Sequence, residues 1–116
     1  RDPFRAEPFL AFVQALRGLG LAVLITELDV REPDQLAPTI PERDAAVADY
    51  VTRFLSAAIE GGARTVLTWG LTDRNSWLAE EAGVARADGQ RTRGLPFDEA
   101  LRPKPFHAAL RRVLGG

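Results

Sequence analysis

Two short apolar runs, each ending abruptly in polar side chains, constrain the fold of this chain most. The first lies in LAVLITELDV (residues 21–30) and the second in ARTVLTWGLTD (residues 63–73). A continuous apolar run of this length, without strict alternation, is typical of a strand buried on both faces of a parallel sheet. The two runs are therefore predicted to be parallel strands.

Three segments with helical periodicity surround these strands. The second begins at Pro41, where a missing N–H costs nothing, and ends at Gly61-Gly62; the third begins near Pro105. The order α-β-α-β-loop-α predicts right-handed βαβ crossovers. Apolar residues at helical spacing mark the first helix: Phe9, Phe12, Val13, Leu16 and Leu19. The predicted buried positions are Val47, Tyr50, Val51, Phe54, Leu55, Ala58 and Ile59 in the second helix, and Phe106, Ala109, Leu110, Val113 and Leu114 in the third.

The length of 116 residues suits one domain, but two parallel strands with helices would leave an open sheet edge and an uncovered face. Parallel sheets are almost always covered on both sides. The chain also begins with Arg1 and contains no methionine. We therefore expect an α/β fragment of a larger sheet or barrel whose amino-terminal part is missing.

Composition excludes several classes of function. Fifteen basic residues against sixteen acidic ones leave a net charge of −1, which predicts binding neither to nucleic acid nor to an anionic membrane. Because the chain has no cysteine and His107 is its single histidine, a metal site is not expected and no cofactor is implied. His107 and four arginines of the long irregular segment from Leu78 to Lys104 are predicted to be solvated: Arg86, Arg91, Arg93 and Arg102.

The polar residues at the strand ends are the candidates for chemistry, since barrel active sites lie at the carboxyl ends of the strands. Glu27 and Asp29 are two positions apart and should share a face, with Thr26 on the opposite face and Leu28 directed toward the helices. One interpretation is a carboxylate nucleophile tuned by its neighbour, and the other is an ion-paired or hydrogen-bonded strand end.

Two tryptophans follow the second strand. Trp69 and Trp77 could wall a sugar site, because an aromatic face suits the apolar face of a sugar ring. Alternatively, at least one of them could belong to the core.

Three ordered stretches carry a family resemblance: LAVLITELDV, then TVLTWGLTDRNSW, then LPFDEALRPKPFHAAL. Together they resemble the carboxyl-terminal part of glycoside hydrolase family 10, the endo-β-1,4-xylanases. The resemblance implies that residues 1–116 form the end of one (β/α)8 TIM barrel: helix 6, strand 7, helix 7, strand 8 and helix 8.

The resemblance also implies roles for individual residues. Glu27 matches the catalytic nucleophile, and Asp29 matches an aspartate that supports the hydrogen-bond network around it. Trp69 and Trp77 match the pair beside the scissile bond, whereas Asp73 and Ser76 match supporting positions. The Asn-Glu pair that carries the family's acid/base does not occur in this chain, and neither does the histidine placed near the nucleophile. Both are expected upstream of Arg1.

The expected partners are therefore xylan or xylo-oligosaccharides and the missing part of the same barrel. The resemblance implies a secreted or periplasmic protein. Another retaining barrel glycosidase, such as a cellulase, and a non-catalytic sugar-binding fragment stay open as alternatives. Hydrolysis of xylan compared with carboxymethyl-cellulose separates the first alternative, and sugar binding by the isolated chain tests the second.

Overall fold

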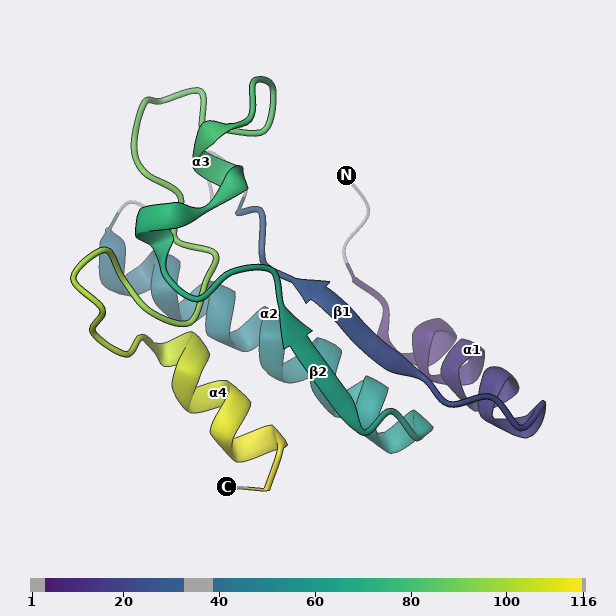
Figure 1. Cartoon of the computed structure of the whole chain (residues 1–116). Helices are drawn as coiled ribbons and strands as arrows, with labels where there is room; N and C mark the ends of the chain where they lie inside the picture. The colour runs from purple at the N-terminus through teal and green to yellow at the C-terminus, as the bar shows by residue number, and fades with distance from the viewer. Residues whose placement is uncertain (1–3, 33–38, 116) are drawn as a thin grey trace.

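A pair of parallel strands lies side by side, with the longest helix passing behind it (Figure 1). The computed structural model describes residues 4–32 and 39–115. The prediction of an α/β chain with the order α-β-α-β-loop-α is confirmed. The elements are α1 (Ala6–Gly18), β1 (Leu24–Leu28), α2 (Ile40–Gly61), β2 (Thr65–Thr68), a 3₁₀ turn (Asp73–Asn75), α3 (Trp77–Glu80) and α4 (Pro105–Val113).

Helix α2 is the central support of the fold, and its ends follow the predicted signals. Thr39 caps its start, because the Thr39 side chain accepts from the Glu42 N–H while the Glu42 carboxylate accepts from the Thr39 N–H. Gly62 ends the helix in the left-handed conformation, with φ of 115°. Local sequence therefore sets both ends of the helix.

The core lies between α2, α4 and one face of the sheet. Strand β1 and the segment just beyond it contribute Leu28 and Val30, so the prediction that Leu28 faces the helices is confirmed. Complete burial of one such aliphatic side chain contributes roughly 1.5–3 kcal/mol. The helices contribute Val47, Ala48, Val51, Leu55, Phe106 and Ala109, all buried.

Helix α1 packs on α2 along a narrower stripe than its periodicity predicted. Val13 is fully buried over Gly61, where an added Cβ would lie 2.7 Å from the Val13 Cγ1. Phe12 and Leu19 are 60% and 76% exposed, although they belong to the same apolar periodicity. Among the described elements, α1 packs mainly on α2, which covers one side of it. Leu114, after α4, is also exposed, contrary to prediction.

The other face of the sheet is uncovered in the described part of the chain. Leu24 and Leu67 are each about half exposed there, as expected for a fragment of a larger sheet or barrel with one face uncovered. No described element lies over this face, whereas the opposite face meets α2 and α4. Within the described ranges, no helix is long and apolar enough to cross a membrane.

Candidate active site

The candidate site lies at the carboxyl ends of β1 and β2. The two strands stay joined beyond their last residues, because the Trp69 N–H donates to the Leu28 carbonyl over 2.9 Å. Glu27 is exposed and Asp29 half-buried at the end of β1, while Trp69 follows β2 directly. Trp77 reaches the same place from the start of α3, and its indole contacts Asp29. The predicted site residues thus converge from two strand ends.

A β-bulge places Glu27. Ile25 pairs with Val66 and Leu28 with Thr68, so β1 contains one more residue than β2 over this interval. Glu27 adopts a φ of 58°, in the left-handed region that non-glycine residues rarely occupy. Thr26 and Glu27 are both exposed, so strict alternation fails here. The extra residue interrupts the two-residue alternation on which the expected opposite faces of Thr26 and Glu27 were based.

A hydrogen bond joins Asp29 to Trp77. The Trp77 Nε1–H donates to the Asp29 Oδ2 over 2.5 Å, across 48 residues of sequence. Burial raises the pKa of Asp29 above its ordinary value; the Trp77 indole N–H lowers it, and the negative charge of Glu27 raises it further. Glu27 and Asp29 are therefore electrostatically coupled.

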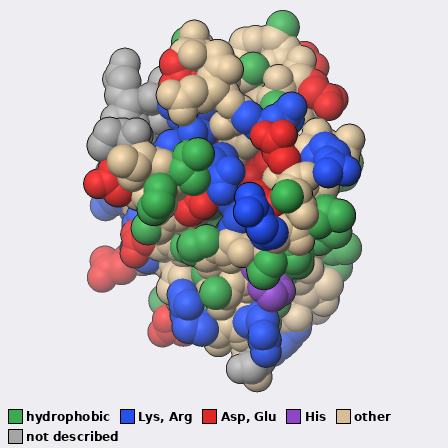
Figure 2. Space-filling model, turned by 90° about the vertical axis from the view of Figure 1, so that its left-hand side faces the viewer, with side chains coloured by type: hydrophobic (Ala, Val, Ile, Leu, Met, Phe, Trp, Pro, Cys, Tyr) green, Lys and Arg blue, Asp and Glu red, His purple; other side chains and the backbone are tan. Residues whose placement is uncertain are grey.

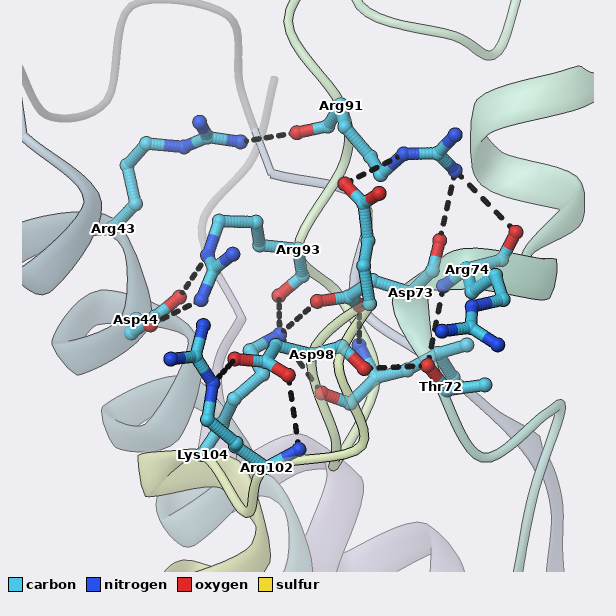
Figure 3. Close-up of polar contacts among 12 residues, drawn as sticks. Arg43, Asp44, Thr72, Asp73, Arg74, Arg91, Arg93, Asp98, Arg102 and Lys104 are labelled. Carbon is cyan, nitrogen blue, oxygen red and sulfur yellow. Dashed lines mark hydrogen bonds and ion pairs between the residues drawn. The ribbon is translucent and has the colours of Figure 1, made fainter.

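A buried ion pair fixes the segment that follows β2. The Asp73 Oδ2 lies 2.7 Å from the Lys104 Nζ, and neither side chain is more than 3% exposed. The same ammonium donates to the carbonyls of Arg93 and Leu95, while the Asp73 Oδ1 accepts from the Leu95 N–H (Figure 3). Lys104 thereby ties the exit of β2 to the start of α4.

Burial and hydrogen bonding act in opposite directions on the ionisation of this pair. Burial raises the pKa of Asp73 and lowers that of Lys104, and their mutual hydrogen bond opposes both shifts. Three oxygen atoms surround the Lys104 Nζ at 2.7–2.9 Å. A protonated ammonium has three N–H donors, one for each of these oxygens. Lys104 is the single lysine of the chain.

A second buried cluster holds the long segment against α2. Glu32 accepts from Arg43 through both carboxylate oxygens, from the Arg93 N–H over 2.9 Å, and lies 3.5 Å from an Arg86 nitrogen. Arg93 pairs with Asp44 through two hydrogen bonds of 2.7 and 2.8 Å. Burial alone would raise the pKa of Glu32, but the hydrogen bonds from Arg43 and the Arg93 N–H outweigh it and lower the pKa.

These contacts correct the prediction that the arginines of the long segment are solvated. The Arg86 side chain is 4% exposed and that of Arg93 16%, because acidic partners from α2 and the segment after β1 compensate their charge. Arg91 and Arg102 do not belong to this buried cluster, and the Arg102 side chain is 78% exposed. No role for Glu32 was predicted from the sequence. Its position two residues after the core residue Val30 was a signal that its side chain could be buried.

On the surface, charges of both signs are interspersed. Figure 2 shows Lys and Arg side chains next to Asp and Glu on one side of the molecule. His107, predicted to lie on the surface, is partly buried and packs on Phe97 with ring centroids 5.0 Å apart. No group of three or more metal-ligating side chains occurs within residues 4–32 and 39–115.

This arrangement has counterparts among known proteins. The sequence profile of Glycosyl hydrolase family 10 matches residues 3–113. The chain belongs to this family. A search of curated proteins finds no significant match.

Solved structures of xylanases share the fold. Xylanase 10B from Thermotoga petrophila, solved with xylobiose, is 26% identical with a TM-score of 0.78, and 97% of this chain matches 32% of that one. Xylanase 10B from Thermotoga maritima gives the same values. A family 10 xylanase from Thermobacillus composti is 26% identical with a TM-score of 0.70, over 96% of this chain and 38% of its own.

The chain therefore spans about a third of the length of the Thermotoga structures that it matches. Its strands and helices correspond to part of a TIM barrel, so the predicted fold class is confirmed. The uncovered sheet face agrees with this, because the inner side of a barrel strand is covered by side chains from the other strands.

Proposed function

We propose that this chain serves as the carboxyl-terminal part of a retaining endo-β-1,4-xylanase and carries its nucleophile, Glu27. The observation that supports this most is the bulge at the end of β1. It holds an exposed carboxylate in a left-handed conformation beside Asp29 and at the joined ends of two parallel strands. Sparsely populated backbone conformations of this kind cluster at active sites.

Glu27 would attack the anomeric carbon of the sugar and form a covalent glycosyl-enzyme. A retaining mechanism needs a second carboxyl group roughly 5–5.5 Å away, which protonates the leaving oxygen and then activates water. We place this acid/base in the part of the barrel upstream of this chain, since the chain contains one asparagine, Asn75, and a serine follows it. A carboxylate nucleophile must be ionised to react.

Trp69 and Trp77 would wall the sugar site next to the scissile bond. Their side chains are 52% and 43% exposed, which leaves ring surface free for the apolar face of a xylose unit. The relative from Thermotoga petrophila was solved with xylobiose, which supports a xylo-oligosaccharide as the ligand here. Because xylan is an external polymer, we also propose a secreted or periplasmic location, which cell fractionation tests.

The deciding experiment replaces Glu27 in the complete barrel that contains this chain. Glu27→Ala and Glu27→Gln should each lower the turnover of xylan by at least about 10³-fold, because both remove the proposed nucleophile that forms the covalent intermediate. The matched control is Glu60→Ala, an exposed position of α2, which should keep wild-type turnover. Near wild-type activity of both Glu27 variants would contradict the assignment, and faster cleavage of carboxymethyl-cellulose than of xylan would identify a cellulase instead.

A further inference from the structure

The hydrogen bond between Asp29 and Trp77 connects the strand end that carries the proposed nucleophile with one of the two proposed aromatic walls of the sugar site. We propose that Asp29 is the positioning residue for Trp77: its carboxylate fixes the indole ring as one wall of the sugar site. This inference rests on the proposed function and assigns to Asp29 a target other than the nucleophile. The two atoms are 2.5 Å apart and come from residues 48 positions apart in the sequence.

The backbone beneath Trp77 is fixed, but the described part of this chain does not hold the ring by burial. Ser76 and Leu78 are 2% and 1% exposed, and the Ser76 Oγ accepts from the Leu78 N–H. Trp77 itself begins the four-residue helix α3 and is 43% exposed. A side chain with that exposure keeps freedom about its two side-chain torsions, so a single directional contact can select one orientation.

Asp29 is suited to provide that contact. An ionised carboxylate is a stronger acceptor than a neutral amide or carbonyl, and the indole has one donor and no acceptor. The backbone on either side of Asp29 is anchored, because the Leu28 carbonyl accepts from the Trp69 N–H and the Val30 N–H donates to the Gly94 carbonyl. The backbone that carries the carboxylate is therefore fixed in position, so the carboxylate can fix the orientation of the ring.

Hydrogen bonds link both proposed sugar walls, Trp69 and Trp77, to two consecutive residues at the end of β1. Trp69 is joined to β1 through its backbone N–H at Leu28, and Trp77 is joined through its side chain at the next residue, Asp29. Glu27 precedes both attachment points. A shift of the bulge would then move the nucleophile and the two rings together, which keeps their mutual geometry constant.

A double-mutant cycle in the complete barrel tests the proposal. Trp77→Phe removes the indole N–H and keeps an aromatic ring, and Asp29→Asn weakens the acceptor at nearly constant shape. We expect each single change to lower kcat/KM for xylo-oligosaccharides by about tenfold, mainly through KM, the loss typical of one hydrogen bond to a charged group. The Trp77→Phe/Asp29→Asn double variant should lose little more than either single variant, since both act on the same bond. Losses that multiply, or a Trp77→Phe loss below about twofold, would overturn the proposal.

Trp69→Phe is the matched control for the cycle. No side-chain hydrogen bond is found for Trp69 in the described part of the chain, so this change should combine with Asp29→Asn by simple multiplication of their effects. A coupling as large as that of Trp77 would contradict the pairing of Asp29 with Trp77.

A spectroscopic readout separates this inference from the proposed activity. In protein labelled with ¹⁵N-tryptophan, the indole N–H resonance of Trp77 is assigned by its loss in Trp77→Phe. It should move upfield in Asp29→Asn and further in Asp29→Ala, whether or not the barrel cleaves xylan. An unchanged resonance in Asp29→Ala would refute the contact, while loss of xylan cleavage with a shifted resonance would refute only the proposed function.

Discussion

Replacement of Lys104 by arginine keeps the positive charge and should nevertheless destabilise the barrel strongly. The ammonium of Lys104 sits among three oxygen atoms, those of Asp73, Arg93 and Leu95, at 2.7–2.9 Å. A compact ammonium can direct its three donors at such a set, whereas a planar guanidinium on a longer side chain cannot. Both partners of the ion pair are almost fully buried, so no solvent is available to replace the lost contacts.

The magnitude follows from the charge that is left behind. Removing one partner of a buried ion pair costs about 3–5 kcal/mol, since the other charge remains buried and uncompensated. We expect Lys104→Met to lose this amount and Lys104→Arg to lose at least half of it. The shift is roughly 2–4 °C per kcal/mol for a domain of 150–250 residues and smaller for a longer chain, so the melting temperature of the complete barrel should fall by at most about 6–20 °C in Lys104→Met.

Thermal and denaturant unfolding of the complete barrel measure the effect. Asp73→Asn/Lys104→Met should recover part of the loss, because the amide oxygen still accepts from the Leu95 N–H and no charge remains buried. The control is Arg53→Lys, an exposed pair with Asp49 that should change stability by less than about 0.5 kcal/mol. A loss below about 1 kcal/mol in both Lys104 variants would refute the reasoning.

Four further predictions concern strain, packing, acid stability and the isolated chain. Glu27→Gly should raise stability by up to about 1 kcal/mol while abolishing activity, because glycine adopts a φ of 58° without steric cost; a clear loss of melting temperature would contradict the strain. Gly94→Ala should cost about 2–3 kcal/mol in denaturant titrations, since its Cβ would lie 2.1 Å from the Val30 carbonyl oxygen, whereas Gly18→Ala, with open space around it, should be neutral. The pKa of Glu32 is lowered in the folded state, so Glu32 stabilises the fold above the ordinary pKa of 4.5, and this stabilisation is lost as the pH falls through the folded-state pKa. In Glu32→Gln, the free energy of unfolding should therefore fall less steeply at acid pH. The isolated 116-residue chain should aggregate or form partly folded oligomers in sedimentation experiments, because an apolar sheet face is uncovered, and cooperative monomeric unfolding would count against this.

Local signals made the course of the chain predictable. The proline and glycine boundaries of α2, the apolar runs of the strands and their polar ends all depend on residues within a few positions of one another. The same signals are sufficient to predict that Glu27, Asp29 and Trp69 lie at one end of the sheet. Family resemblance added their proposed roles, which periodicity alone could not supply.

The remaining features depend on contacts between distant residues. Helical periodicity identified an apolar face of α1 but could not show that only part of it meets a neighbour, so the exposure of Phe12 could not be predicted. The arginines of the long segment looked solvated because their acidic partners, Glu32 and Asp44, lie about 50 residues away in sequence. The left-handed conformation of Glu27 could not be predicted either, because neither glycine nor asparagine, the residues that usually signal it, stands at this position.

The bulge of β1 has a consequence for how such strands can evolve. Two residues separate Ile25 from Leu28, yet both side chains face the helices. The strand therefore presents core-facing side chains to the helices on both sides of the inserted residue. An insertion of this kind alters one surface of a strand and leaves the other in register. The catalytic side of a barrel strand can therefore gain or lose a residue without a compensating change in the helices, which allows the chemistry at the mouth to diversify while the scaffold stays constant.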